Sequence, residues 1–265
     1  MNLNTLILPL SNIAIIAGKI ILTYYKNLKD IKIKDDSSPL TEADLESNSF
    51  IIKKLKQIDP SIPILSEESL VEWSTRKKWS TYWLIDPLDG TKEFIDQNGE
   101  FTVNIALIEN NKPILGIIYA PALSTLYYAY KNSGCYKINC TNVLKNLNKS
   151  NKIHVNKKNK SDHLLVVGSR SHSNEDFSLW VNNNVKDYEI VKKGSSLKFC
   201  NIADGNADIY PRFGLTSEWD IAAGHIILNE AGGNIKSIDN SEIFYNTKEN
   251  ILNPYFIASG LIINE

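Results

Sequence analysis

One stretch, YWLIDPLDGTKEFI at residues 82–95, constrains the fold of this chain more than any other. It begins with four apolar, strand-forming residues and then places two aspartates, a proline, a glycine and a threonine within six positions. Pro87 has no backbone N–H and a fixed φ, so it cannot continue the hydrogen-bond ladder of a central strand. The sequence therefore predicts a buried strand that ends at Asp86 and a chain that then bends away from the sheet.

The bend is rich in oxygen atoms. Asp86 and Asp89, three residues apart, would lie on one side of a compact turn, with the Leu88 carbonyl exposed between them. Gly90 allows the tight turn, and Thr91 is a good first residue for the helix that follows. Hard oxygen ligands beside a helix N-terminus suit a metal ion and a phosphate group. A simple surface turn explains the same residues, because Asp-Gly is common between regular elements.

Other acids stand at the ends of predicted elements. Glu67 and Glu68 follow the apolar strand SIPILS, and Asp220 stands at the start of the helix EWDIAAG. Each of these acids alone is better explained as a helix cap or a solvated side chain. Together with Asp86 and Asp89 they supply enough carboxylates for a two-metal site, whereas the 4 histidines lack the spacing of zinc or iron ligands.

Three other acid-based sites do not match this pattern. Phosphatases of the haloacid-dehalogenase type carry D-x-D-G-T with a nucleophilic first aspartate, and the spacing here, D-x-x-D-G-T, is one residue longer. An EF-hand needs acids at alternate positions, and a glycosidase needs two carboxylates without a Gly-Thr step. We therefore do not expect an aspartyl-phosphate intermediate.

The rest of the chain alternates helix and strand patterns, which predicts an α/β fold. Thr41 with Asp44 predicts the start of a helix, and residues 101–136 are typical of a strand meander with an Asn-Asn turn. The Lys- and Asn-rich run at 141–162 predicts a solvated connection. We expect an N-terminal α+β lobe at residues 1–150, which carries most of the acids, and a C-terminal α/β lobe at residues 151–265, which carries Asp220.

The first 25 residues are strongly apolar. A signal peptide would carry positive charge before the apolar run, but the first basic residue here is Lys19. Asn, Ser and Pro9 interrupt the run. We interpret it as an amphipathic helix packed on the body of the protein, with no integral membrane segment.

Charge and cysteine content narrow the environment and the partners. The formal net charge of -1 offers no basic field for a nucleic acid polymer. Cys135, Cys140 and Cys200 are an odd number without a C-x-x-C pair, which argues against disulfides and favours a reducing compartment. We expect a cytoplasmic protein, monomeric or homodimeric. Because its N-terminus is apolar, a peripheral contact with the inner membrane stays an alternative.

Three motifs together resemble one superfamily. The acidic pair Glu67-Glu68, the segment DPLDGT and the segment WDIAAG occur in the order found in the inositol monophosphatase superfamily of magnesium-dependent, lithium-sensitive phosphatases. The resemblance extends from about residue 34 to the end of the chain. It implies an α/β fold of the α+β layered type, with layers in the order αβαβα.

Further segments are similar to one branch of that superfamily, the CysQ-type 3'(2'),5'-bisphosphate nucleotidases. These segments are KDDSSPLTEAD, DPLDGTKEFI, VGSRSH, GSSLKFC and EWDIAAGHIILNEAGG. Plain inositol monophosphatases usually carry Asn-Phe soon after the Gly-Thr, where this chain has Lys92, Glu93 and Phe94. The segment FGLTSEWD departs from relatives, which tend to have proline after the glycine, so this loop is expected to differ locally.

The resemblance implies a metal role for the acids. It assigns a first metal ion to Glu67, Asp86 and the Leu88 carbonyl, and a second to Asp86, Asp89 and Asp220. Glu67, Leu88, Asp89 and Asp220 would also contact the substrate. Mg²⁺ fits because every implied ligand is an oxygen and the substrate phosphate can complete the octahedral shell. In-line attack by water, without a phosphoenzyme, is the chemistry expected of two such ions.

The resemblance also implies how water and phosphate are held. Thr91, supported by Asp44 and Glu67, would orient and deprotonate the attacking water. The backbone amides of Gly90 and Thr91 would receive the scissile phosphate. Lys34 would lie near a weaker, third metal position.

Specificity is expected to come from the C-terminal lobe. The resemblance assigns the second phosphate and the adenine to His172, Ser195, Lys198 and Arg212, and lysine and arginine are suited to phosphate. The expected reaction converts 3'-phosphoadenosine 5'-phosphate to AMP, with 3'-phosphoadenosine 5'-phosphosulfate as a further substrate, and supports sulfate assimilation. An inositol or sugar phosphatase of the same fold, and an inactive metal- or nucleotide-binding regulator, are the alternatives.

Overall fold

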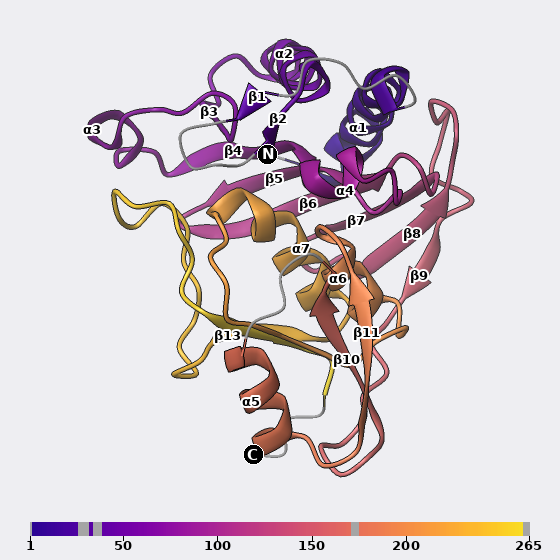
Figure 1. Cartoon of the computed structure of the whole chain (residues 1–265). Helices are drawn as coiled ribbons and strands as arrows, with labels where there is room; N and C mark the ends of the chain where they lie inside the picture. Colours follow the sequence, from indigo (N-terminus) through magenta and orange to yellow (C-terminus); the bar gives the residue numbers. More distant parts are fainter. Residues whose placement is uncertain (1, 26–31, 34–38, 171–174, 262–265) are drawn as a thin grey trace.

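The computed structural model describes residues 2–25, 32–33, 39–170 and 175–261, which form alternating layers of helix and sheet (Figure 1). Helices α1 (Leu3–Tyr25) and α2 (Glu42–Ile58) cover the outer face of a seven-stranded sheet. Helices α6 (Leu197–Ala203) and α7 (Glu218–Glu230) lie between that sheet and a five-stranded sheet, and α5 (Glu175–Asn184) lies beyond the second sheet. The expected αβαβα order is confirmed.

The seven-stranded sheet is antiparallel except at one edge. In spatial order its strands are β3 (Ile64–Ser66), β4 (Thr81–Asp89), β5 (Thr102–Glu109), β6 (Lys112–Ala120), β7 (Thr125–Tyr130), β8 (Cys135–Asn139) and β9 (Asn151–Ile153). Only β3 and β4 in this sheet run parallel. Asn110 and Asn111 take positive φ values of 49° and 64° between β5 and β6, which is the geometry of a tight hairpin turn.

The five-stranded sheet combines parallel and antiparallel pairs. Its spatial order is β11 (Tyr188–Lys193), β10 (Leu164–Ser169), β12 (Ile209–Arg212), β14 (Phe256–Ser259) and β13 (Asn234–Ser237). β10 is parallel to both β11 and β12, and the remaining two pairs are antiparallel. Smaller elements are α3 (Trp73–Arg76), α4 (Thr91–Ile95) and the antiparallel ribbon of β1 (Lys32–Ile33) with β2 (Pro39–Leu40).

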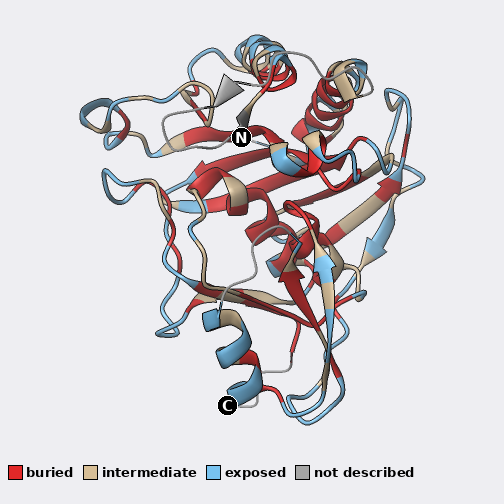
Figure 2. Ribbon diagram, in the orientation of Figure 1, coloured by how far each residue is buried: buried red, intermediate tan, exposed pale blue. Residues whose placement is uncertain are grey.

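Helix α7 is the centre of the molecule, and nearly all of it is buried (Figure 2). It packs closely on the first sheet at Gly116 of β6, where an added Cβ would lie 2.6 Å from the Ala223 carbonyl oxygen of α7. A side chain at position 116 would therefore push the helix off the sheet. Burial on both sides explains why the sequence of α7 is apolar around most of its circumference.

Helix α1 is packed on the body, as the sequence indicated. It buries ten residues, among them Ile7, Leu10 and Ile21, against its neighbours. By length and composition α1 could cross a membrane, but 56% of its most apolar 18-residue stretch is buried within the fold. A buried core helix passes the same test of length and hydropathy.

The prediction that the strand YWLI, at residues 82–85, stops at Asp86 is wrong. Strand β4 continues to Asp89: Asp86 pairs with Asn104 and Asp89 pairs with Thr102, with a register shift between the two pairs. One extra residue on β4 makes a β-bulge, which leaves part of the ladder unpaired. Pro87 lies in this bulge, where its missing N–H costs no hydrogen bond.

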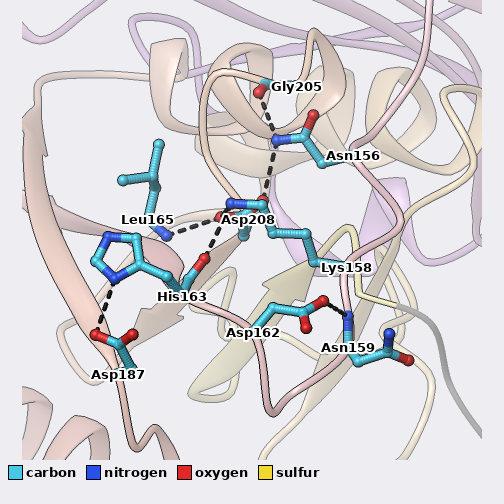
Figure 3. Close-up of polar contacts among 9 residues, drawn as sticks. All are labelled: Asn156, Lys158, Asn159, Asp162, His163, Leu165, Asp187, Gly205 and Asp208. Atoms are coloured by element: carbon cyan, nitrogen blue, oxygen red, sulfur yellow. Dashed lines mark hydrogen bonds and ion pairs between the residues drawn. The ribbon is translucent and has the colours of Figure 1, made fainter.

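The connection between the sheets is tied to the second sheet by a buried aspartate (Figure 3). Asp208, 1% exposed, accepts hydrogen bonds from the Leu165 N–H (2.7 Å), Lys158 Nζ (2.9 Å) and Asn156 Nδ2 (3.0 Å). The first sheet ends at Ile153, three residues past the expected boundary at residue 150. The division into two lobes stays a prediction.

Candidate active site

One cavity of about 260 Å³ lies where the end of β4, the starts of α4, α6 and α7, and the end of β12 meet. Its charged lining residues are Glu67, Asp86, Asp89, Lys92, Glu93, Lys198, Arg212 and Asp220. Leu88, Gly90, Thr91 and Ser195 line it as well. The cavity therefore brings together acids that precede residue 100 with basic residues that follow residue 195. Glu68 is not among its lining residues.

The β-bulge shapes the part of the cavity lined by Asp86, Leu88 and Asp89. The Leu88 N–H donates to Asp86 Oδ1 (3.1 Å), and the Leu88 carbonyl accepts from Thr91 Oγ1 (3.2 Å). Gly90 precedes α4 at φ 86°, a left-handed conformation that glycine adopts at low cost. An added Cβ at Gly90 would meet Ser195 Cβ at 3.1 Å. The turn thus exposes backbone and carboxylate oxygens on a rigid support.

Asp44 joins α2 to the threonine that opens α4. Its Oδ2 caps the helix by accepting from the Thr41 N–H (2.8 Å) and Thr41 Oγ1 (2.6 Å). Its Oδ1 accepts from Thr91 Oγ1 (3.2 Å). Asp44 is only 2% exposed, so this contact is shielded from bulk water. The predicted pairing of Asp44 with Thr91 is present as a hydrogen bond.

Asp86, Asp89 and Asp220 share one feature: a single oxygen of each is held by the protein. Asp89 Oδ2 accepts from the Ser196 N–H at 2.6 Å, and Asp220 Oδ2 accepts from the Ser217 N–H at 2.8 Å in a helix capping box. Within the described part of the chain, the second oxygen of each of the three accepts no hydrogen bond. Three carboxylate oxygens therefore remain for a ligand.

Burial and mutual repulsion perturb the pKa values of these carboxylates. Burial raises the pKa of Asp86, and the charges of Glu67, Asp89 and Asp220 raise it further. Burial also raises the pKa of Asp220, reinforced by Asp89 and Glu67. Among the described residues, no three acidic, histidine or cysteine side chains already converge as ligands around one point. A divalent cation would relieve the repulsion, and an all-oxygen donor set fits Mg²⁺.

Lys198 and Arg212 bring positive charge to the lining of the cavity. Burial lowers the pKa of Lys198 to about 8, although the nearby Asp89 charge favours its protonated form. Arg212 donates from Nη2 to the Leu215 carbonyl (3.0 Å), while its buried Nε has no hydrogen-bond partner among the described residues. A buried guanidinium N–H without an acceptor is costly and suits an anionic ligand.

Comparison with known proteins identifies the family of this chain. Residues 2–264 match the Inositol monophosphatase family. The chain belongs to this family. Among curated relatives, a 3'(2'),5'-bisphosphate nucleotidase CysQ from Salmonella typhimurium is 43% identical over 91% of this chain and 94% of the relative. The protein of the same name from Escherichia coli K12 is 41% identical over 92% and 95%.

Solved structures of inositol monophosphatase family members share the fold. The crystal structure of CysQ from Bacteroides thetaiotaomicron superposes with a TM-score of 0.83 and 38% identity, over 94% of each chain. An inositol monophosphatase from Anabaena gives a TM-score of 0.75 with 25% identity, over 98% of this chain and 92% of that one.

Two residues that the family resemblance assigned, His172 and Lys34, lie outside the described residues. Sequence reasoning missed a buried polar group behind the acids. Asn104 and Thr102 of β5 donate to Asp89 Oδ2 at 3.3 and 3.4 Å, and Asn104 also donates to Ser196 Oγ at 2.9 Å. One signal was present: Asn104 interrupts an otherwise apolar run, FTVNIALI, in a strand buried on both faces.

Ser195 stands out by its backbone. It lines the cavity with a φ of 45°, a left-handed conformation that a non-glycine residue rarely adopts. Its neighbour Gly194 leaves no room for a side chain, since an added Cβ would lie 2.5 Å from Glu93 Cγ and 2.9 Å from the Glu100 carbonyl oxygen. Such local strain is typical of functional sites.

Proposed function

We propose that this protein hydrolyses the 3'-phosphate of 3'-phosphoadenosine 5'-phosphate to give AMP and phosphate, in a reaction that depends on Mg²⁺. The observation that carries the proposal is one cavity lined both by carboxylates and by Lys198 and Arg212. An inositol monophosphate has one phosphate, for which the metal ions suffice. A bisphosphate nucleotide has a second phosphate, and the basic pair supplies a place for it.

The acids would hold two Mg²⁺ ions. Glu67, Asp86 and the Leu88 carbonyl form one ligand set, and Asp86, Asp89 and Asp220 form the other. When bound, Mg²⁺ would lower the pKa of the attacking water and neutralise the charge on the leaving oxygen. The bulge keeps Asp86 and Asp89 on one support, so ordering these ligands costs little entropy when the ions bind.

Thr91 and Asp44 would position the attacking water. Thr91 Oγ1 donates toward Asp44 Oδ1 and the Leu88 carbonyl, which leaves its lone pairs free to accept from water. A proton taken from that water can pass through Thr91 to Asp44, with Glu67 as a second acceptor. The Gly90 and Thr91 amides would bind the transferred phosphoryl group, so the route needs no nucleophilic side chain and no phosphoenzyme.

The nucleotide would extend from the metals toward the second sheet. Lys198, Arg212 and Ser195 would hold the 5'-phosphate. A hollow of about 150 Å³ shares Ser169, Tyr210 and Arg212 with the cavity and adds the apolar residues Phe177, Ile190 and Phe213, which suit a purine base. The sulfated nucleotide, 3'-phosphoadenosine 5'-phosphosulfate, fits the same contacts.

The setting of the enzyme is also part of the proposal. The cysteines Cys135, Cys140 and Cys200 are buried thiols rather than disulfides, which suits the cytoplasm. We propose an N-terminal lobe with most metal ligands and a C-terminal lobe with the nucleotide pocket, working as a monomer or homodimer.

The test compares phosphate release from 3'-phosphoadenosine 5'-phosphate, its 5'-phosphosulfate and inositol 1-phosphate, with Mg²⁺ and with EDTA. We expect the bisphosphate nucleotide to give the highest kcat/KM and EDTA to abolish turnover. Faster turnover of inositol 1-phosphate would assign the protein to the inositol phosphatases instead. No turnover of any substrate would support the inactive regulator.

A further inference from the structure

We propose that Ser196 is a positioning residue that sets the placement of Asp89 relative to Asp220. The inference rests on the proposed function, because it concerns how the two acids are arranged to share a metal ion. Asp89 ends strand β4 of the first sheet, and Asp220 lies in the first turn of α7. The capping box fixes Asp220 within α7 but does not fix it against Asp89.

Ser196 contacts both acids directly. Its N–H donates to Asp89 Oδ2 at 2.6 Å, and its Oγ donates to the Asp220 backbone carbonyl at 2.7 Å. The same Oγ accepts from Asn104 Nδ2 at 2.9 Å, and Asn104 also donates to Asp89. The hydroxyl is therefore used as donor and acceptor at once, which determines its orientation completely.

The position of Ser196 in its own helix argues against an ordinary capping role. Ser196 precedes α6 as the N-cap residue, where a serine hydroxyl usually accepts from a backbone N–H of the first turn. The Ser196 side chain makes no such cap bond. Its hydroxyl instead joins α7 to β5, and it does so at 1% exposure, where no water replaces either partner.

Mg²⁺ tolerates only small changes in the distance to its oxygen ligands. Oxygen ligands of Mg²⁺ lie in a narrow range near 2.0–2.1 Å and demand near-ideal geometry. A helix turn that moves by a few tenths of an ångström would displace Asp220 from that range. Residues that orient ligands from behind typically contribute 10- to 100-fold in metal affinity or activity.

Ser196→Ala tests the inference, because alanine keeps the N–H bond to Asp89 and removes both bonds of the hydroxyl. We expect Mn²⁺, used as a probe in the absence of substrate, to bind about 10-fold more weakly at one position in a calorimetric titration. The Mg²⁺ concentration for half-maximal activity should rise by about the same factor. At saturating Mg²⁺ the KM for the nucleotide should change less than about twofold, because Ser195 and Lys198 are untouched.

A matched control removes another buried serine hydroxyl. Ser237 of β13 is 6% exposed and bonds to Asp239 and Ser241, away from the cavity. Ser237→Ala should leave Mn²⁺ binding unchanged. Ser196→Thr, which retains the hydroxyl, should recover most of the lost affinity.

Two results would overturn the inference: a wild-type Mn²⁺ titration for Ser196→Ala, or equal weakening in the Ser237→Ala control. If Ser196→Ala does not fold, Asn104→Ala replaces it, because that variant removes the donor that orients Ser196 Oγ. A wild-type Mn²⁺ titration for Asn104→Ala would also overturn the inference. A wild-type protein that binds Mn²⁺ but releases no phosphate refutes the proposed function alone. The titrations still decide the role of Ser196 in that case.

Discussion

Replacement of Asp89 by asparagine should separate stability from activity. Asp89 is repelled by the carboxylates of Asp86 and Asp220, and its own pKa is raised by burial. In the absence of metal its charge therefore works against the fold. We expect Asp89→Asn to fold as well as the wild type in EDTA and to lose nearly all turnover.

The opposing contributions are of similar size. At an effective dielectric constant near 20, each like-charged neighbour costs on the order of 1–3 kcal/mol, which the variant recovers. Against this, the hydrogen bond from the Ser196 N–H becomes a neutral one, a loss of about 1 kcal/mol, and the attraction to Lys198 disappears. The free energy of unfolding in EDTA should thus stay within about 2 kcal/mol of the wild type. Loss of a metal ligand should lower kcat/KM by more than about 1000-fold, which corresponds to about 4 kcal/mol.

Urea unfolding in EDTA and in Mg²⁺, together with phosphate release, provides the assay. Mg²⁺ at 100 times its Kd stabilises a protein by about 2.7 kcal/mol, and the variant should gain much less. Asp96→Asn, the same change at an exposed residue of the loop after α4, is the control and should behave as the wild type. Near-normal turnover by Asp89→Asn, or an unchanged gain from Mg²⁺, would refute the metal assignment.

Three other predictions concern pH, the nucleotide and the fold. The raised pKa values of Asp86 and Asp220 mean that the folded state binds more protons than the unfolded state. The unfolding free energy in EDTA should therefore fall as pH rises above about 4, the ordinary pKa of an aspartate, and Mg²⁺ should abolish much of that slope; a flat profile in EDTA contradicts this prediction. With a pKa of about 8, Lys198 should lose its charge near pH 8, so kcat/KM for the nucleotide should decline above that pH. Lys198→Met should raise the KM for the nucleotide about 10- to 100-fold at pH 7, and an unchanged KM would exclude a contact between Lys198 and the nucleotide. Asp208→Ala should lower the unfolding free energy by about 3 kcal/mol in a denaturant titration. The control, Asp187→Ala at an exposed residue, should change it by less than about 0.5 kcal/mol, and equal effects of the two variants would show that the hydrogen bonds of Asp208 are unimportant for stability.

Local rules explain what could be predicted from the sequence. The start of α2 at Thr41 with Asp44, the turn at Gly90 and the helix that begins at Thr91 depend on neighbours within a few residues. The Asn110 hairpin is equally local. These features were predicted correctly because cap and turn chemistry belongs to the residue types themselves.

The errors and omissions have a common cause in long-range pairing. Strand β4 passes Pro87 because β5 offers a partner beyond the bulge, and no rule confined to the proline reveals that partner. Ser196 meets Asn104 and Asp89 only when α6 is packed between the two sheets. A serine before a short helix carries no sign of that contact, so its part in the site required the folded structure.

The close packing of α7 against Gly116 has a consequence for how substrate preference can change over time. Helix α7, which carries Asp220, is packed too closely to slide between the two sheets. The cavity therefore cannot widen by a rigid movement of this helix. Exposed Leu215 lines the cavity from the segment between β12 and α7, and exposed connecting segments generally tolerate insertions and exchanges. Exchanges in this segment can therefore alter substrate preference while α7 and the two sheets keep their places.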